Sequence, residues 1–304
     1  MQLGAVLPTD DLPTDAGAVR AFAQGLEALG FGYLSVFDHV VNASSAHYDR
    51  EVLKGPYRED NVFRDPFVLF GFLAGVTRAL AFATNILVVS QRQTVLVAKQ
   101  AAEVDILSGG GRLRIGLGTG WNYVEYESLG MSFADRGAML EEQIAVLRKL
   151  WTEPLVHFEG RFHRIMHAGL NPMPLTRPIP IWLGGTSDPV IRRVGRTADG
   201  WMPLFPQLDK TPGAIKRTAE WLEPEVAMAR MRAEALKAGR DPAAIGVEGR
   251  ITYLGDEPEA WRAIRDIHRA NGAGYITIMM KPGLVQGVDP ILAALERVKR
   301  ALSS

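Results

Sequence analysis

Short, uninterrupted apolar runs recur along this chain and alternate with segments of helical periodicity, and this alternation restricts the fold more than any other feature. Continuous apolar runs are typical of parallel strands that are buried on both faces. Eight of them occur, at residues 3–7, 33–37, 81–89, 113–118, 179–185, 201–205, 245–254 and 275–280. Between them, apolar residues recur at helical spacing, as at Phe22, Leu26 and Leu29, which predicts amphipathic helices.

The eight strand–helix alternations predict an α/β fold, a (β/α)8 TIM barrel that forms one domain over residues 1–304. A doubly wound open sheet is the alternative. Three segments exceed the short connections of a barrel, and they predict insertions after strands 2 and 4 and before strand 5, at residues 40–66, 121–137 and 152–178. The first two follow strands and are candidate lids. The third contains a predicted hairpin and is either a lid or a cap on the barrel rim.

Composition excludes several kinds of site. The chain carries 34 basic and 34 acidic residues, so its zero net charge gives no reason to expect a nucleic-acid or membrane partner. It has no cysteine, which excludes disulfides and thiolate chemistry, and its other polar residues show no metal-ligand spacing, so no metal is expected. With neither a signal-peptide pattern nor a membrane-length apolar stretch, a cytoplasmic protein is expected.

Asp38 and His39 follow the second predicted strand, at the end where barrel enzymes place catalytic residues. A histidine there can act as an acid or base near neutral pH, or donate a hydrogen bond to a cofactor ring. The alternative is that the two side chains pair structurally. Lys281, after the eighth strand, could form a Schiff base as in aldolases, although its setting, MMKPG, favours a solvated turn.

Two glycine-containing turns also follow predicted strands. The segment IGLGTGW (115–121) has alternating glycines, which permit close approach of a ligand to the backbone, but its spacing does not match a dinucleotide fingerprint. Trp121 at its end either stacks on a flat ring or anchors its loop. The turn at 184–189 enters a helix, whose free N–H groups and dipole favour a phosphate. A plain glycine turn capped by Asp188 is the alternative.

The ordered series of motifs resembles the luciferase-like monooxygenase superfamily over nearly the whole chain. The motifs are DH (38–39), LSGG with R (107–112), GLGTGW (116–121), EYESLG (125–130), RG (136–137), LW (150–151) and GG with DGW (184–201). So many matches in order make the resemblance specific. Within the superfamily, FDHVV and IWLGG look most like the subgroup of F420-dependent oxidoreductases.

The resemblance implies a barrel that binds the deazaflavin coenzyme F420, or alternatively FMN, at the carboxyl ends of its strands. His39 would lie near the reactive face of the cofactor ring, with Asp38 beside it, as the catalytic residues. A non-prolyl cis peptide between Asn85 and Ile86 would press against the back of the ring. The residues that would bind the cofactor are Asn85, Ile86, Val88, Gly118, Thr119, Gly120, Trp121, Gly184, Gly185 and Thr186.

The resemblance also implies hydride transfer to or from a small, apolar organic substrate. Sugar-phosphate dehydrogenases of the superfamily have an acidic Glu at the position of Trp121, so a sugar phosphate is not expected here. One alternative is an FMN-dependent monooxygenase that receives reduced flavin from a partner reductase. Another is a non-catalytic flavin-binding barrel. A homodimer is also expected, with the apolar segment 67–80 as its interface, unless that segment is a core helix.

Overall fold

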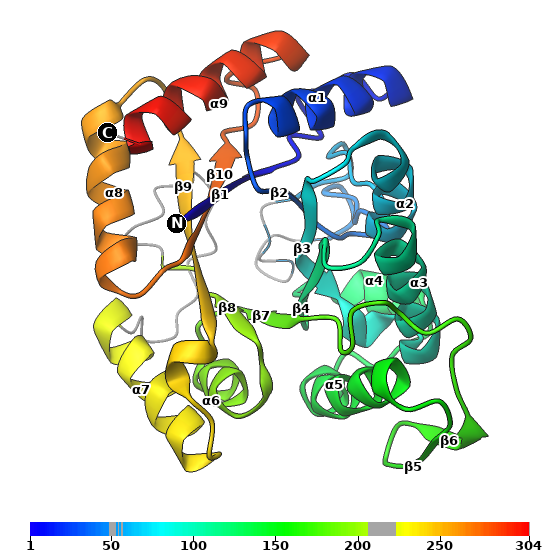
Figure 1. Cartoon of the computed structure of the whole chain (residues 1–304). Coiled ribbons are helices and arrows are strands. Elements are labelled where there is room, and N and C mark those ends of the chain that lie inside the picture. Colours follow the sequence, from blue (N-terminus) through cyan, green and yellow to red (C-terminus); the bar gives the residue numbers. More distant parts are fainter. Residues whose placement is uncertain (49–52, 54, 56, 206–222, 304) are drawn as a thin grey trace.

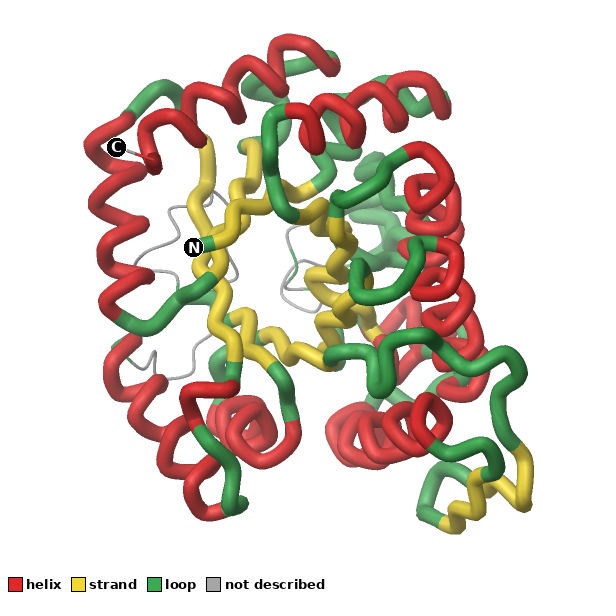
Figure 2. The backbone as a smooth tube through the Cα atoms, in the orientation of Figure 1, coloured by secondary structure: helices red, strands yellow, loops and turns green. Residues whose placement is uncertain are grey.

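Eight parallel strands close into a barrel in the order β1-β10-β9-β8-β7-β4-β3-β2, with helices around it (Figures 1 and 2). The computed structural model describes residues 1–48, 53, 55, 57–205 and 223–303. The strands of the barrel are β1 (Gln2–Val6), β2 (Tyr33–Val36), β3 (Ala81–Val88), β4 (Leu113–Gly118), β7 (Ile181–Gly184), β8 (Gly200–Met202), β9 (Gly246–Tyr253) and β10 (Tyr275–Met280). Each predicted apolar run therefore overlaps a barrel strand. The TIM-barrel prediction is confirmed, and the open-sheet alternative is wrong.

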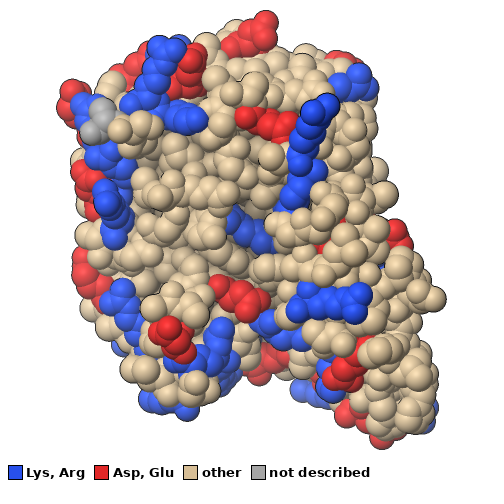
Figure 3. All heavy atoms as spheres, viewed as in Figure 1, with Lys and Arg blue, Asp and Glu red and all other residues tan. Residues whose placement is uncertain are grey.

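The helices lie mostly outside the barrel (Figure 2). They are α1 (Ala16–Ala28), α2 (Pro66–Val76), α3 (Thr94–Leu107), α4 (Tyr123–Ser128), α5 (Arg136–Thr152), α6 (Asp188–Thr197), α7 (Pro224–Lys237), α8 (Pro258–Ala270) and α9 (Val288–Ser303), with the short 3-10 helices η1 (Val89–Gln91) and η2 (Pro242–Ala244). None of the helices that the structure describes is long and apolar enough to cross a membrane. On the face that Figure 3 shows, acidic and basic side chains are interspersed.

The three insertions occupy different positions. The segment 40–66 follows β2, and its residues 49–52, 54 and 56 lie outside the described residues. The segment 121–137 contains α4 after β4. The third contains the predicted hairpin, β5 (Val156–Glu159) and β6 (Arg164–Ala168), which lies at the periphery beside α5 (Figure 1). Its His163 bonds to Glu142 of α5 and Thr94 of α3, so this insertion packs on the outer helices.

The apolar segment after Asp65 forms α2, which is mainly a core helix. Asp65 accepts hydrogen bonds from the N–H groups of Phe67 and Val68, which starts the helix at Pro66. Most of its apolar side chains are buried, whereas Val68 is 74% exposed. Core packing therefore explains most of this segment, and the homodimer stays a prediction.

The interior of the barrel contains a polar network centred on Glu248 of β9. One carboxylate oxygen, Oε1, accepts hydrogen bonds from Thr277 Oγ1 at 2.6 Å and from Asn85 Nδ2 at 3.2 Å. The other, Oε2, forms an ion pair with Arg114 of β4. Tyr33 of β2 joins the network through a 2.7 Å hydrogen bond between its hydroxyl and Thr277 Oγ1. One buried carboxylate thus connects several strands across the barrel.

The guanidinium of Arg114 is enclosed by aromatic rings as well as by the carboxylate. Its Cζ lies 4.0 Å from the ring centroid of Tyr33, 4.5 Å from that of Trp182 and 4.7 Å from that of Tyr275. The negative faces of such rings attract a cation, most strongly where water is excluded. Figure 3 shows basic side-chain atoms in the hollow at the centre of this face. The charge of Arg114 is therefore compensated by Glu248 and the three rings, although its buried Nε has no hydrogen-bond partner among the described residues.

Substituting Arg114 by methionine should lower the free energy of unfolding by about 3–5 kcal/mol, because Glu248 would remain buried without its cation. The double variant Arg114→Met/Glu248→Gln should lose less than the sum of the two single variants. Urea unfolding followed by circular dichroism measures both effects. Additive losses would show that the ion pair contributes no coupling.

Glu27 of α1 provides a pH-dependent contact on the outside of the barrel. Its Oε1 accepts hydrogen bonds from the N–H groups of Arg78, Ala79 and Leu80 at 2.9, 2.6 and 2.8 Å. Burial raises the pKa of the Glu27 carboxyl, but these backbone donors lower it by more, and the net pKa lies below its usual value. The ionised carboxylate therefore stabilises the connection between α2 and β3.

A depressed pKa contributes stability above the unfolded-state value of about 4.3, and that stability is lost as the pH falls through the lower folded-state value. Glu27→Gln should therefore lower the free energy of unfolding at about pH 7 and have a smaller effect at about pH 3. Urea titrations of both proteins at each pH measure the difference. A destabilisation that is equal at the two pH values would contradict this assignment.

Candidate functional site

His39 lies beyond the carboxyl end of β2 and is bound by a buried carboxylate from α4. Its Nδ1 is 2.8 Å from Oε2 of Glu125, whose side chain is almost completely buried. The other oxygen, Oε1, accepts a hydrogen bond from the N–H of Val40 at 2.6 Å. Glu125 therefore holds both the imidazole and the backbone that follows it. The sequence contained this residue in the EYESLG motif, but no role was predicted for it.

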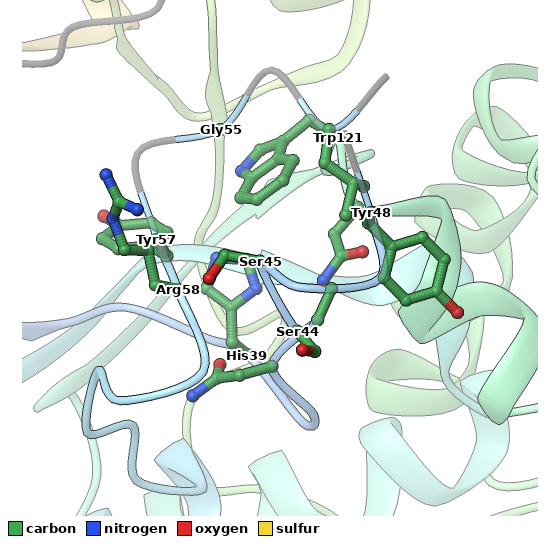
Figure 4. Close-up of a pocket in the computed structure, with 12 residues that line it drawn as sticks. His39, Ser44, Ser45, Tyr48, Gly55, Tyr57, Arg58 and Trp121 are labelled. Atoms are coloured by element: carbon green, nitrogen blue, oxygen red, sulfur yellow. The ribbon is translucent and has the colours of Figure 1, made fainter. Parts of the chain in front are cut away.

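An aromatic wall surrounds the imidazole of His39. The ring centroids of Phe63, Tyr57 and Trp121 lie 4.6, 5.0 and 5.7 Å from that of His39, and all three contacts are edge-to-face. Figure 4 shows Tyr57 and Trp121 around His39. Burial raises the pKa of the Tyr57 phenol to about 12, against an opposing effect of the Arg250 charge, so this ring stays neutral near pH 7. The sequence analysis missed Tyr57 and Phe63.

The segment that carries Phe63 is held in place from two sides. Asp10, after β1, accepts hydrogen bonds from the Val62 N–H at 2.7 Å and from Asn61 Nδ2 at 2.9 Å. Asn42 Nδ2 donates to the Asn61 carbonyl at 2.7 Å. Asn42 and Asn61 lie in a long insertion, where polar residues are usually solvated, and Asp10 lies in a loop after β1. None of the three was therefore predicted from the sequence to have a role. Here they fix part of the wall against His39.

A pocket opens beside His39, and its walls are both aromatic and polar (Figure 4). Tyr57 and Trp121 line it together with Asn42 and Ser44. No described residue forms a hydrogen bond with His39 Nε2, whereas Nδ1 is taken by Glu125. The imidazole can therefore exchange a proton with a molecule in this pocket through one nitrogen only.

Asp38 has a different environment from its neighbour. Its carboxylate is 3% exposed, accepts a hydrogen bond from the Val88 N–H at 2.9 Å and pairs with Arg92 Nη2 at 2.5 Å. Burial raises the pKa of Asp38, and Arg92 and the Val88 amide oppose that effect. Asp38 and His39 thus take different partners, and the alternative in which they pair with each other is wrong. The contacts of Asp38 tie the end of β2 to the end of β3, and its catalytic role stays a prediction.

The predicted cis peptide between Asn85 and Ile86 is present. Ile86 stands against two of the predicted glycines, because a Cβ added at Gly118 or at Gly184 would lie 2.6 Å from its side chain. Gly120, at φ 63°, is equally close to Val88, with a Cβ distance of 2.8 Å. These predicted residues therefore come together at the strand ends. The glycines are required by close approach within the protein, whether or not a ligand also uses the space.

The other predicted cofactor-binding residues lie in the loops after β4 and β7. The Thr119 carbonyl accepts a hydrogen bond from the Tyr126 hydroxyl at 2.7 Å. Gly185 has φ 107°, a conformation that favours glycine, and leads through Thr186 to the start of α6. The N–H groups of Thr186 and Ser187 have no acceptor among the described residues.

Asp188 does not compete for these N–H groups as the sequence suggested. It is the first residue of α6 rather than its cap, which is Ser187. Its carboxylate pairs with Arg192 at 2.7 Å and with Arg230 at 3.3 Å, so its charge is compensated. Among the described residues no side chain therefore competes for these N–H groups, and the phosphate site stays a prediction.

Among the remaining candidates from the sequence, the Schiff-base role of Lys281 stays a prediction. Lys281 lies in the turn after β10, where its N–H donates to the Tyr253 carbonyl at 3.2 Å. Within the described ranges, no three His, Asp or Glu side chains come together as metal ligands.

Comparison with known proteins assigns the family. An uncharacterised protein of Mycobacterium tuberculosis is 35% identical over 218 residues, which cover 68% of this chain and 73% of that protein. An F420-dependent glucose-6-phosphate dehydrogenase of Intrasporangium calvum is 28% identical over 236 residues, 70% of this chain and 68% of the relative. The solved structure of an F420-dependent secondary alcohol dehydrogenase with an F420–acetone adduct has the same fold, with a TM-score of 0.72 at 16% identity and coverage of 99% and 98% of the two chains.

The sequence profile of the family described as luciferase-like monooxygenase matches residues 1–286, which is nearly the whole barrel. The glycines, the cis peptide and the histidine of the site all lie within the matched residues. The chain is thus a member of the luciferase-like monooxygenase family.

Proposed function

We propose that the protein is an oxidoreductase that uses the deazaflavin coenzyme F420 for hydride transfer to or from a small organic substrate. The observation that carries this proposal is the imidazole of His39, which lies in an aromatic-walled pocket beyond the strand ends with Nε2 available. The choice of F420 is supported by relatives of this chain whose names state that coenzyme.

The residues present fit a flat ring that carries a phosphate. Ile86 offers an apolar surface between Gly118 and Gly184, at the ends of two adjacent strands. The turn after Gly184 then presents the N–H groups of Thr186 and Ser187, which have no acceptor within the described part of the chain and suit a phosphate. This arrangement would serve F420 and FMN alike, because both combine a flat ring system with a phosphate. The choice between them therefore rests on the relatives.

Hydride donation or acceptance at a ring carbon is the chemistry that F420 supplies when it is bound. A proton must accompany the hydride wherever the substrate gains or loses an O–H bond, and His39 Nε2 would take up or supply that proton. Tyr57, Phe63 and Trp121 would exclude water and orient the substrate. The three rings support a substrate with an apolar part, while Arg58, Asn42 and Ser44, which also line the pocket, would bind a polar or anionic group of it.

Parallel fluorescence titrations of the purified protein with F420 and with FMN test the cofactor. We expect tight binding of F420 and at least about tenfold weaker binding of FMN, which corresponds to about 1.4 kcal/mol. Tight FMN binding without F420 binding, together with formation of an oxygenated substrate from reduced FMN and oxygen, would instead support a monooxygenase.

His39→Ala should lower kcat by about 100-fold or more, since a positioned acid or base contributes about that factor. Binding of F420 should change little, because the proposed role concerns the proton. Turnover would be followed by the absorbance of F420 with a panel of secondary alcohols, and of reduced F420 with ketones and enones. His157→Ala, at an exposed position in the β5–β6 hairpin, is the matched control. An unchanged kcat in His39→Ala would remove His39 from the mechanism.

A further inference from the structure

Glu125 faces the imidazole of His39 and also accepts hydrogen bonds from the backbone that follows this histidine. Its Oε1 accepts from the N–H of Val40 at 2.6 Å and lies 3.4 Å from that of Val41, while its Oε2 faces Nδ1 of His39 at 2.8 Å. An ionised carboxylate has acceptors only. An ionised Glu125 would therefore require a proton on the nitrogen that faces it, and would hold the imidazole as well as the backbone.

We propose that Glu125 is the positioning residue of the site: it holds His39 with the proton on Nδ1 and presents an unprotonated Nε2 to the pocket. The carboxylate is 1% exposed, so water does not replace it as the acceptor. The three rings of the aromatic wall restrict rotation of the imidazole from the other side. The catalytic consequence rests on the proposed function, whereas the tautomer does not.

A second histidine–glutamate pair in the same chain shows what distinguishes this one. His163 Nδ1 lies 2.7 Å from Glu142 Oε1, much as His39 lies from Glu125. The Nε2 of His163, however, is taken by Thr94 Oγ1 at 2.6 Å, so that both ring nitrogens are satisfied within the protein. A ring with two internal partners is a structural connector. The ring of His39 lines the pocket and has one hydrogen-bond partner among the described residues, so it is arranged to exchange a proton through its other nitrogen.

Glu125→Gln tests the proposal because glutamine has nearly the same shape as glutamate. One of the two acceptor oxygens of the carboxylate is replaced by an NH2 donor. The amide oxygen would remain at the N–H of Val40, which needs an acceptor, and the amide N–H2 would then face Nδ1 of His39. Nδ1 would have to accept, and the proton of the neutral imidazole would move to Nε2. The variant should therefore reverse the tautomer without removing the side chain.

The readout is a nitrogen-15 spectrum of the imidazole rings in histidine-labelled protein at alkaline pH, with the His39 signals assigned by their loss in His39→Ala. We expect Nδ1–H and a bare Nε2 in the wild type, and the opposite in Glu125→Gln. Glu142→Gln is the matched control and should leave the His39 signals and kcat unchanged. With a substrate identified in the panel of alcohols, ketones and enones, Glu125→Gln should lower kcat by about 10- to 100-fold. It should leave the Kd of F420 within about threefold of the wild-type value.

A wild-type spectrum with the neutral proton on Nε2 would overturn the proposal, and it does so even if the variant does not fold. An unchanged Nδ1–H tautomer in a folded Glu125→Gln protein would also overturn it. Failure of F420 to bind would instead contradict the proposed function, and the spectra would still decide the role of Glu125. The two ideas therefore fail in different measurements.

Discussion

The buried carboxylate of Glu248 is the interaction on which the interior of this barrel depends. It faces Arg114 from one strand, Thr277 from another and Asn85 from a third. A charge taken out of water is tolerated only where a counter-charge and hydrogen bonds compensate it. Three aromatic rings around Arg114 complete that compensation. The network fixes Asn85, the residue directly before Ile86, and so connects the barrel interior to the proposed cofactor site.

A second set of contacts fixes the strand ends relative to one another. Asp38 binds the N–H of Val88 and the side chain of Arg92, which holds the end of β2 against the end of β3. Ile86 then meets Gly118 of β4 and Gly184 of β7. Close approach of this kind is open only to glycine, because any Cβ would overlap with the isoleucine. The site is therefore assembled on rigid strands, while the loops supply its walls.

The chemistry of the site depends on a division of roles between neighbouring residues. Asp38 stabilises the fold through its contacts at the end of β3, whereas His39, its neighbour in the chain, lines the pocket. The partner that completes His39 comes from α4, 86 residues further on. A histidine is most useful as an acid or base when one ring nitrogen is held by the protein and the other is left to the substrate. That arrangement distinguishes His39 from His163, whose nitrogens are both bonded internally.

The sequence by itself determined the barrel, the hairpin and the positions of the glycines. Continuous apolar runs and strand-end motifs are local signals, and each reflects burial or backbone conformation at its own residues. Only the tertiary structure decided the partners: Glu125 for His39, Arg92 for Asp38 and Glu248 for Asn85. Side-chain contacts between residues 50 or more positions apart leave no periodicity, because their geometry arises when the barrel closes. The choice of tautomer at His39 belongs to the same class, since it depends on a carboxylate that folding brings to it.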